Sequence, residues 1–275
     1  MEPGTVVAER FEIERRVTRG GAAAVFRARD RRDGSRVALK ILRIGDDDEP
    51  RARLFREAAI LERLHHPGIV RYIAHGETRL RDAYLAMEWI DGETLASRLA
   101  RSELTTIESV RLVMRVAENL SAAHLEGIVH RDITPANVIL RDGNLTNPTL
   151  IDFGIARLGL GPSSLTSVGS VLGTFGYMAP EQASGVEHLD ARADVFALGA
   201  MLFRCLTGVA AYSGEDDVAI LSKLLSSAPP RARALRRDLP VALDELLARM
   251  MSREPADRPR NAGVVAAQLA AVRAG

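Results

Sequence analysis

The sequence predicts an α+β fold with two lobes: a β-rich N-terminal lobe with one main helix at residues 1–89, and a mainly α-helical C-terminal lobe at residues 90–275. Before residue 90, short runs of alternating and β-branched residues are separated by turn residues, a pattern typical of strands. After it, apolar residues recur mostly at helical spacing. A chain of 275 residues can bury a core large enough for both lobes.

Within the first lobe, one amphipathic helix is expected between two groups of strands. Pro50 suits the first turn of a helix. Apolar residues then recur at helical spacing from Leu54 to Leu64, and the helix should end near Pro67. The expected strands are residues 11–17, 25–30, 36–42, 69–76 and 83–90.

In the second lobe, several periodic segments end at turn or helix-breaking residues. One segment, Arg157–Ser170, is rich in Gly and Ser and has no clean period, so a mobile functional loop is expected there. The expected helices are Thr94–Ala100, Ser109–Leu125, Arg192–Leu206, Val218–Ser226, Val241–Met251 and Ala262–Arg273.

The bulk composition excludes several classes of protein. A formal net charge of +1 gives no electrostatic case for binding nucleic acid or a membrane surface. The single cysteine, Cys205, rules out a disulfide framework and fits a reducing compartment. The longest apolar run, Val195–Phe203, is too short to span a bilayer. We therefore expect a cytoplasmic domain, although the whole protein could be membrane-anchored beyond this chain.

Lysine is rare in this sequence, and one lysine stands in an unusual place. Of 37 basic residues, only Lys40 and Lys223 are lysines. Lys223 lies on an expected exposed helical face. Lys40 lies in the apolar, strand-like run RVALKIL, where a charge is costly unless it is paired. Because Arg and Lys differ in shape and hydration, a lysine retained here indicates a functional position.

The most informative stretch runs from His130 to Gly154. Asp132 and Asn137 lie in HRDITPAN, and Asp152 follows the short apolar run before it. A turn-rich tract, RDGNLTNP, separates two apolar runs, which predicts a hairpin that brings Asn137 and Asp152 close together. A carboxylate that can accept a proton, beside an Asn and an Asp that can hold Mg²⁺, is the arrangement that phosphoryl transfer needs.

These motifs occur in the order found in protein kinases, which the chain resembles from about Phe11 to Val272. VALK, HRDITPAN, DFGIAR and GTFGYMAPEQ are most similar to bacterial Ser/Thr kinases of the eukaryotic-like type. The resemblance implies the two-lobed protein kinase fold. It also implies transfer of the γ-phosphoryl group of ATP, with Mg²⁺, to Ser or Thr hydroxyls of protein substrates.

The resemblance assigns a role to each catalytic residue. Lys40 would contact the α- and β-phosphates, with Glu57 as its ion-pair partner. Asp132 would orient the acceptor hydroxyl and take its proton, and Asn137 and Asp152 would hold Mg²⁺. His130 and Phe153 would pack into the core, Glu181 and Arg258 would form a buried ion pair, and Asp194 would anchor the backbone of the catalytic loop.

The resemblance also places the nucleotide pocket. The phosphate loop, VTRGGAAAV, departs from the family's three-glycine pattern: Thr18 and Ala23 replace two glycines and Gly20 is kept, which predicts weaker ATP binding. Met87 would be the gatekeeper behind adenine. The expected nucleotide-binding residues are Val17, Gly20, Val25, Ala38, Lys40, Met87, Glu88, Ile90, Asn137, Ile139 and Asp152.

Thr134 is the sharpest departure from the family, which has Lys at this position in most Ser/Thr kinases. Thr can form hydrogen bonds but carries no charge, and losing one preorganised group can cost on the order of 10²–10³ in rate. Three interpretations stay open: an active kinase with an altered catalytic loop, a slow kinase that needs an activator, and a pseudokinase that binds ATP as a scaffold.

The segment from Asp152 to Glu181 matches the family's activation segment. Thr174 matches the Thr that bonds the catalytic Asp and favours Ser/Thr as the acceptor. Arg131 could pair with a phosphorylated loop residue after autophosphorylation. The candidate phosphorylation sites are Thr166, Ser167 and Ser170, with Ser163 and Ser164 as weaker ones.

Two further alternatives come from other functional classes. A small-molecule phosphotransferase on a related fold would share the Lys and both Asp residues, but would not be expected to carry GTFGYMAPE. A non-catalytic ATP-binding module would be supported only by Thr134 and the depleted phosphate loop. The oligomeric state stays open, with a back-to-back homodimer, which similar kinases form, as one option.

Overall fold

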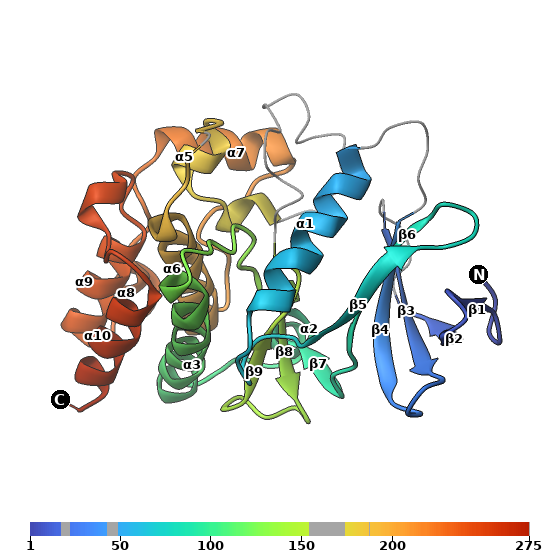
Figure 1. Ribbon diagram of the computed structural model, residues 1–275. Coiled ribbons are helices and arrows are strands. Elements are labelled where there is room, and N and C mark those ends of the chain that lie inside the picture. The colour runs from blue at the N-terminus through green and yellow to red at the C-terminus, as the bar shows by residue number, and fades with distance from the viewer. Residues whose placement is uncertain (18–22, 43–48, 154–173, 187, 275) are drawn as a thin grey trace.

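The computed structural model describes residues 1–17, 23–42, 49–153, 174–186 and 188–274. Figure 1 shows two lobes: strands β1–β6 with helix α1 on one side, and a larger group of helices on the other. We call them the small and the large lobe. This arrangement agrees with the α+β, two-lobed fold that the sequence predicts.

The small lobe is built on one antiparallel sheet with the strand order β1-β2-β3-β4-β6-β5. In β4, Val37, Leu39 and Ile41 are buried, whereas Ala38 and Lys40 on the other face are half-buried. This alternation is the period-2 pattern of a strand with two different faces. The strands are β1 (Val6–Val7), β2 (Phe11–Arg16), β3 (Ala23–Asp30), β4 (Arg36–Leu42), β5 (Tyr72–Glu77) and β6 (Ala83–Glu88).

Helix α1 (Glu49–Arg63) packs against β4, β5 and β6. Its inward stripe contains Leu54, Ala58 and Leu61, as the helical spacing predicts, together with one charged residue, Glu57. A buried carboxylate on an apolar stripe needs a partner, so Glu57 marks the side of α1 that faces the functional site.

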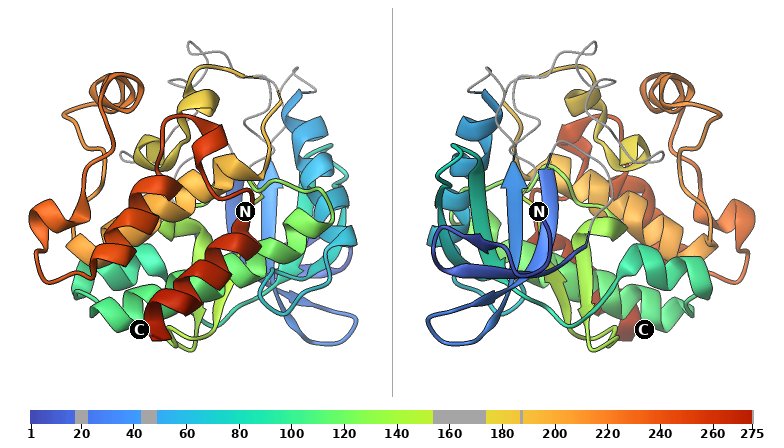
Figure 2. Two further views of the ribbon diagram at one scale, coloured as in Figure 1. Left: turned by 90° about the vertical axis from the view of Figure 1, so that its left-hand side faces the viewer. Right: turned by 90° about the vertical axis from the view of Figure 1, so that its right-hand side faces the viewer.

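The large lobe is organised around α3, which packs against α6 and α10 (Figure 2). A complete capping box, in which Thr105 and Glu108 bond each other's backbone N–H groups, begins α3. Gly208, with φ 75°, ends α6. The helices are α2 (Leu95–Arg101), α3 (Thr106–Leu125), α5 (Pro180–Ala183), α6 (Ala191–Thr207), α7 (Asp217–Ser226), α8 (Ala232–Leu235), α9 (Val241–Met250) and α10 (Ala262–Ala274), with the 3₁₀ turns η1 (Pro135–Asn137), η3 (Thr174–Tyr177) and η4 (Pro255–Asp257).

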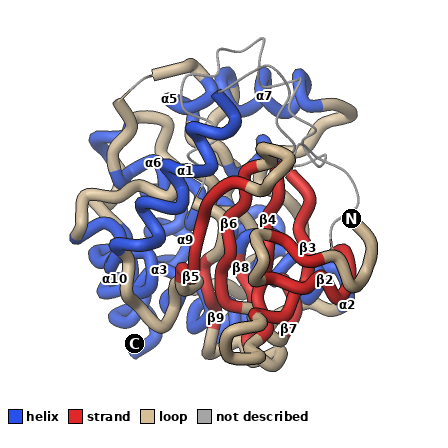
Figure 3. Tube along the Cα trace, turned by 45° about the vertical axis from the view of Figure 1, so that its right-hand side comes forward, coloured by secondary structure: helices blue, strands red, loops and turns tan. Residues whose placement is uncertain are grey.

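A second, three-stranded sheet lies beside the first and carries the catalytic hairpin. Its strands are β7 (Gly92–Thr94), β8 (Val138–Arg141) and β9 (Pro148–Leu150). Figure 3 shows the strands of both sheets gathered on one side of the molecule, with most helices on the other.

The structure corrects one predicted strand. Residues 69–76 are not one strand, because β5 begins only at Tyr72. Ile69 instead forms a parallel bridge with Leu150, and the Val70 N–H donates to the Leu150 carbonyl at 2.9 Å. Residues 69–76 therefore contribute to both sheets. Ile69 and Val70 bond the segment after α1 to the large lobe. Among the described helices, none combines the length and apolarity needed to cross a bilayer.

Candidate active site

The hairpin of β8 and β9 positions the first pair of candidate residues. Val138 pairs with Leu150, and the Ile151 N–H donates to the Asn137 carbonyl at 3.0 Å. Asn137 therefore lies directly across the open end of the hairpin from the segment that leads to Asp152. The hairpin that the turn-rich tract predicts is present.

Asn137 also reaches the proposed catalytic base. Its amide Nδ2 donates to Asp132 Oδ2 at 2.9 Å and to the Asp132 carbonyl at 2.8 Å. Since the nitrogen end of the amide is turned to Asp132, the oxygen end is the atom of Asn137 that suits a cation. The same bonds hold the Asp132 carboxylate beside the hairpin.

Lys40 connects the two lobes at the site. Its Nζ lies 3.0 Å from both Glu57 oxygens and 2.9 Å from Asp152 Oδ1. The strand β4, the helix α1 and the end of the hairpin each supply one member of this cluster. The single cation is thus shared by two carboxylates, which explains why a lysine is tolerated in an apolar strand.

The electrostatics of this cluster follow from burial and charge. Burial would lower the pKa of Lys40, but Asp152 and Glu57 outweigh it and raise the pKa above its ordinary value. The charge on Lys40 lowers the pKa of Asp152. Burial dominates at Glu57 and raises its pKa to about 7. Lys40 is therefore fully charged, and Glu57 is the group of the three that titrates near neutral pH.

Asp194 on α6 anchors the catalytic loop, the segment HRDITPAN at residues 130–137. Its buried carboxylate accepts the N–H groups of His130 and Arg131, both at 2.7 Å, and lies 2.9 Å from His124 Nε2. Arg131 has a φ of 67°, which is unfavourable for a side chain with a Cβ. The anchoring by Asp194, which the resemblance to kinases implies, stabilises this strained backbone just before Asp132.

His130 is fully buried and packs against Phe153. Its Nδ1 accepts the Asp132 N–H at 3.3 Å, its Nε2 lies 3.2 Å from the Ile151 carbonyl, and its ring lies 4.4 Å from that of Phe153. Burial lowers the pKa of His130, which favours the neutral imidazole. The expectation that His130 and Phe153 pack into the core is confirmed.

The face of the sheet that carries Lys40 also carries several of the expected nucleotide-binding residues. Val25 pairs with Lys40 across β3 and β4, and Ala38 pairs with Met87 across β4 and β6. Met87 and Ile90 are buried. Elsewhere, Val17 is 41% exposed at the end of β2, Glu88 ends β6 and Ile139 is half-buried on β8. Gly20 lies outside the described residues.

Thr134 precedes Pro135 at the start of η1 and is buried. Its carbonyl accepts the Asn137 N–H at 3.0 Å, so its backbone shapes the turn that presents Asn137. The threonine side chain brings no charge to the catalytic loop.

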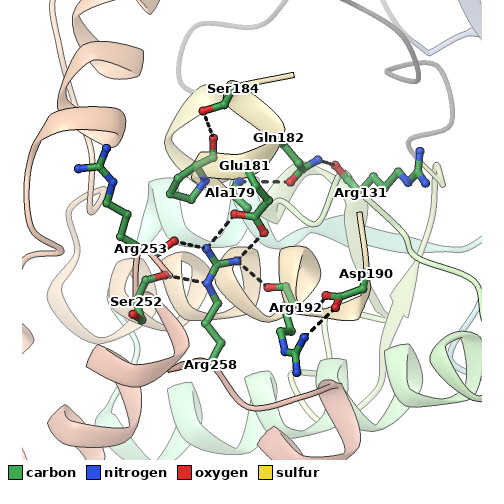
Figure 4. A network of polar contacts seen from close by, with 11 residues as sticks. Arg131, Ala179, Glu181, Gln182, Ser184, Asp190, Arg192, Ser252, Arg253 and Arg258 are labelled. Carbon is green, nitrogen blue, oxygen red and sulfur yellow. Dashed lines mark hydrogen bonds and ion pairs between the residues drawn. The ribbon is translucent and has the colours of Figure 1, made fainter. Parts of the chain in front are cut away.

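Behind the site, Arg258 and Glu181 form a bidentate ion pair at 2.7 and 2.8 Å (Figure 4). This pair, which the resemblance to kinases implies, holds α5 in place. The next residue on α5, Gln182, donates to the Arg131 carbonyl at 3.0 Å. The α5 segment is thereby linked to the catalytic loop.

Several candidate regulatory residues cannot be placed. Thr166, Ser167 and Ser170, with Ser163 and Ser164, lie outside the described residues, as does the whole of the predicted loop Arg157–Ser170. The backbone of Thr174 begins η3, but its side chain is not described.

Some residues around the site are absent from the sequence-based list. Arg141 on β8 donates to Glu88 at 2.8 Å and thus joins the large lobe to the end of β6. Trp89, the next residue, lies beneath two arginines of the small lobe. No local pattern in the sequence marks such contacts. The single tryptophan of the chain, two residues after the proposed gatekeeper Met87, is nevertheless a signal in itself.

Comparison with known proteins identifies one family. Residues 11–269 match the protein kinase domain model. The serine/threonine-protein kinase pkn3 of Myxococcus xanthus is 35% identical over 98% of this chain and 51% of its own length. PknJ of Mycobacterium tuberculosis is 38% identical over 95% of the chain and 45% of its own length. PknA of the same species is 34% identical over 99% and 63%. The chain thus spans about half the length of these relatives.

Proposed function

The chain belongs to the protein kinase domain family, as a bacterial catalytic domain of the eukaryotic-like serine/threonine type, and we propose that it transfers the γ-phosphoryl group of Mg·ATP to protein Ser or Thr hydroxyls. One observation carries the proposal: Lys40 contacts both Glu57 and Asp152, while Asn137 contacts Asp132. The residues that the reaction needs come from distant parts of the chain and meet between the lobes.

We assign nucleotide binding to residues 1–89 and the chemistry and substrate platform to residues 90–275. Lys40 would contact the α- and β-phosphates, and Val17, Val25, Ala38 and Met87 would enclose adenine. The backbone of residues 88–90 would bond its edge, with Ile139 below and Gly20 in the phosphate loop. The half-buried face that contains Ala38 and Lys40 supports this assignment.

The residues present fit a magnesium ion. Asn137 and Asp152 offer an amide oxygen and a carboxylate oxygen, the hard ligands that Mg²⁺ prefers, and the charge on Lys40 keeps Asp152 ionised. Two protein ligands suffice, because Mg²⁺ retains waters and binds phosphates. When bound, the ion would neutralise charge on the phosphates.

Asp132 would act on the acceptor. Its carboxylate, held by Asn137 at 2.9 Å, would orient the Ser or Thr hydroxyl and accept its proton as the oxygen attacks phosphorus. Thr174 would bond Asp132 from the substrate side. Arg131 would pair with a phosphate on Thr166, Ser167 or Ser170 and so order the activation segment.

Thr134 leaves a second candidate in view, a slow or non-catalytic ATP-binding scaffold. A neutral residue replaces a charge near the γ-phosphate, which predicts a reduced rate and not a lost one. The similar full-length Ser/Thr kinases and the complete catalytic set do not favour the non-catalytic alternative.

The substrates would be proteins with Ser or Thr acceptors, in the cytoplasm where ATP is available. The net charge of +1 gives no support for nucleic acid as a partner. A homodimer of small lobes is a further option for activation in trans.

The deciding experiment is transfer of radiolabelled γ-phosphate with Mg²⁺ to the protein itself and to a generic Ser/Thr substrate. We expect transfer by the wild type and its loss in Asp132→Asn. A faster Thr134→Lys variant would show that the natural loop is slowed by its missing charge. Nucleotide binding without transfer by the wild type would contradict the proposal and favour the scaffold.

A further inference from the structure

Two arginines stand directly opposite each other at the root of the phosphate-loop hairpin. Arg15 on β2 and Arg27 on β3 are cross-strand partners. Like charges at such positions are destabilising unless something offsets the repulsion. A register shift between Ile13 and Arg15 turns Arg15 to the same side as Arg27.

The contact that offsets this repulsion comes from Trp89, in the segment 88–90 whose backbone is proposed to bond adenine; we call this segment the hinge. The guanidiniums of Arg15 and Arg27 lie 5.6 and 5.7 Å from the ring centroid of Trp89, within the range of a cation–π contact, and Trp is the strongest partner for one. Glu14 pairs with Arg27 at 2.6 Å. Arginines from two strands of the small lobe, β2 and β3, thus contact a single indole ring.

Trp89 is itself fixed in place. Its Nε1–H donates to Asp91 at 2.9 Å, and its backbone N–H donates to the Arg36 carbonyl at 3.2 Å. Trp89 lies between Glu88 and Ile90, the proposed adenine-binding backbone. A shift of the indole ring would therefore also move that backbone.

Both arginines also lie near the two valines that are expected to enclose adenine. Val17 follows Arg15 by two residues, Val25 precedes Arg27 by two, and the Val17 N–H donates to the Val25 carbonyl at 2.8 Å. The sequence between them keeps one of the family's three glycines, a departure that predicts weaker binding of phosphates. A second contact that holds the hairpin in place would therefore strengthen nucleotide binding.

We propose that Arg15, Arg27 and Trp89 form a latch that holds the phosphate-loop hairpin against the hinge, and that both arginines are positioning residues for the nucleotide. The proposal rests on the proposed function, since it requires adenine at the hinge. The latch acts on nucleotide affinity and leaves the catalytic loop untouched.

The test compares the Arg15→Gln/Arg27→Gln double variant with the wild type. A cation–π contact at an exposed site is worth roughly a 2- to 5-fold change in affinity, so the double variant should raise the KM for ATP and the Kd for Mg·ADP by about 5- to 20-fold. The kcat and the KM for a peptide substrate should stay unchanged. Arg15→Lys/Arg27→Lys, which keeps both cations, should recover most of the affinity.

Arg29→Gln is the matched control, because Arg29 carries the same charge on the same strand and pairs with the same Glu14, yet its cross-strand partner is Glu12. It should leave the KM for ATP unchanged. The fluorescence of the only tryptophan gives a second readout: acrylamide should quench Trp89 more strongly in the double Gln variant.

Each outcome is decisive. An unchanged nucleotide affinity, or an equal loss in Arg29→Gln, would overturn the latch. If the double variant does not fold, the two single variants carry the same comparison with smaller expected changes. If the wild type binds Mg·ADP but transfers no phosphate, the proposed function fails while the binding data still test the latch. If the wild type binds no nucleotide, both are overturned.

Discussion

The guanidinium of Arg258 is fully buried, and each of its N–H groups donates a hydrogen bond. Two of these bonds go to the carboxylate of Glu181. The remaining donations go to the carbonyls of Ser252, Arg192 and Arg253. Figure 4 shows how this one side chain joins α5, the start of α6 and the segment after α9. The pair is a structural junction, and its value depends on both partners being present.

We therefore expect Arg258→Met to destabilise the protein by about 3–5 kcal/mol, because it leaves the Glu181 carboxylate and three carbonyls without their donor. Urea unfolding followed by circular dichroism measures this. Arg192→Gln is the control: its ion pair with Asp190 is exposed and should be worth under about 1 kcal/mol. Equal losses in the two variants would contradict the junction.

The two lysines of the chain provide a matched comparison at the nucleotide site. Lys40→Met should reduce phosphate transfer by at least about 10²-fold, since it removes the cation that Glu57 and Asp152 position. Lys40→Arg should not restore the rate, because a planar fork cannot replace a compact ammonium here. Lys223→Met, which removes a bond to the Ser213 carbonyl, should behave as wild type. Transfer rates with a generic Ser/Thr substrate decide the matter.

Glu57 predicts a pH dependence of stability. Its pKa is raised from its ordinary value of 4.5 to about 7 by burial, so between these values the folded state binds a proton that the unfolded state has lost. The stability contributed by Glu57 is thus fully present below about pH 4.5 and is lost as pH rises through about 7. The free energy of unfolding of the wild type relative to Glu57→Gln should fall across this window, by at most about 1.4 kcal/mol per pH unit.

Unfolding titrations of both proteins from pH 4.5 to 8.5 test this sign. Effects of other groups cancel in the difference between the two proteins. A difference that stays level over this range, or rises slightly near pH 4.5, would mean that Lys40 outweighs burial and that Glu57 stays ionised in the folded protein.

Asp194 separates a role in catalysis from a role in folding. Asp194→Asn turns an acceptor of three N–H groups into one with a single acceptor oxygen, so the strained backbone at Arg131 loses part of its support. We expect a loss of about 2–4 kcal/mol in stability and at least a 10-fold lower kcat. Asp244→Asn is the control, because Asp244 is equally buried and bonds Arg231 and the Arg233 backbone far from the catalytic loop.

For the control, stability should fall while the kcat of the folded fraction stays unchanged. Steady-state kinetics at a temperature where both variants are folded distinguish the two. A normal kcat in Asp194→Asn would show that the loop holds its shape without this carboxylate.

The elements and the catalytic hairpin were predictable because their signals are local. Periodic apolar residues mark α1, and turn residues between two short apolar runs mark the β8–β9 hairpin. Lys40 was recognisable because a charge in an apolar strand is costly. The resemblance to kinases then supplied the partners, Glu57 and Asp152, which no local pattern joins.

Contacts between distant segments were not predictable in the same way. The split of residues 69–76 between two sheets depends on where Leu150 lies, and the stack of Arg15 on Trp89 depends on a strand bulge. Arg141 gave no signal among 35 arginines, although it bonds Glu88 at the hinge. Such pairs are set by tertiary packing, which leaves no period in the sequence.

Gly68 and Asn119 are such a pair, and they allow a sharp test of how the lobes are joined. A Cβ at Gly68 would lie only 2.0–2.2 Å from three side-chain atoms of Asn119. The Gly68 carbonyl accepts the Leu150 N–H at 2.9 Å, and Asn119 donates to the Pro148 carbonyl at 2.8 Å, so both are fixed to β9 and neither can move aside cheaply.

Gly68→Ala should therefore destabilise the protein by roughly 1–3 kcal/mol through overpacking. Asn119→Ala alone should cost about 1 kcal/mol for the lost hydrogen bond. In the double variant the alanine methyl group gains the vacated space, so the combined cost should be smaller than the sum of the two, which a double-mutant cycle of unfolding free energies measures. Additive costs would mean that the loop after α1 shifts on β9 to make room for the methyl group, and that Asn119 does not hold it in place.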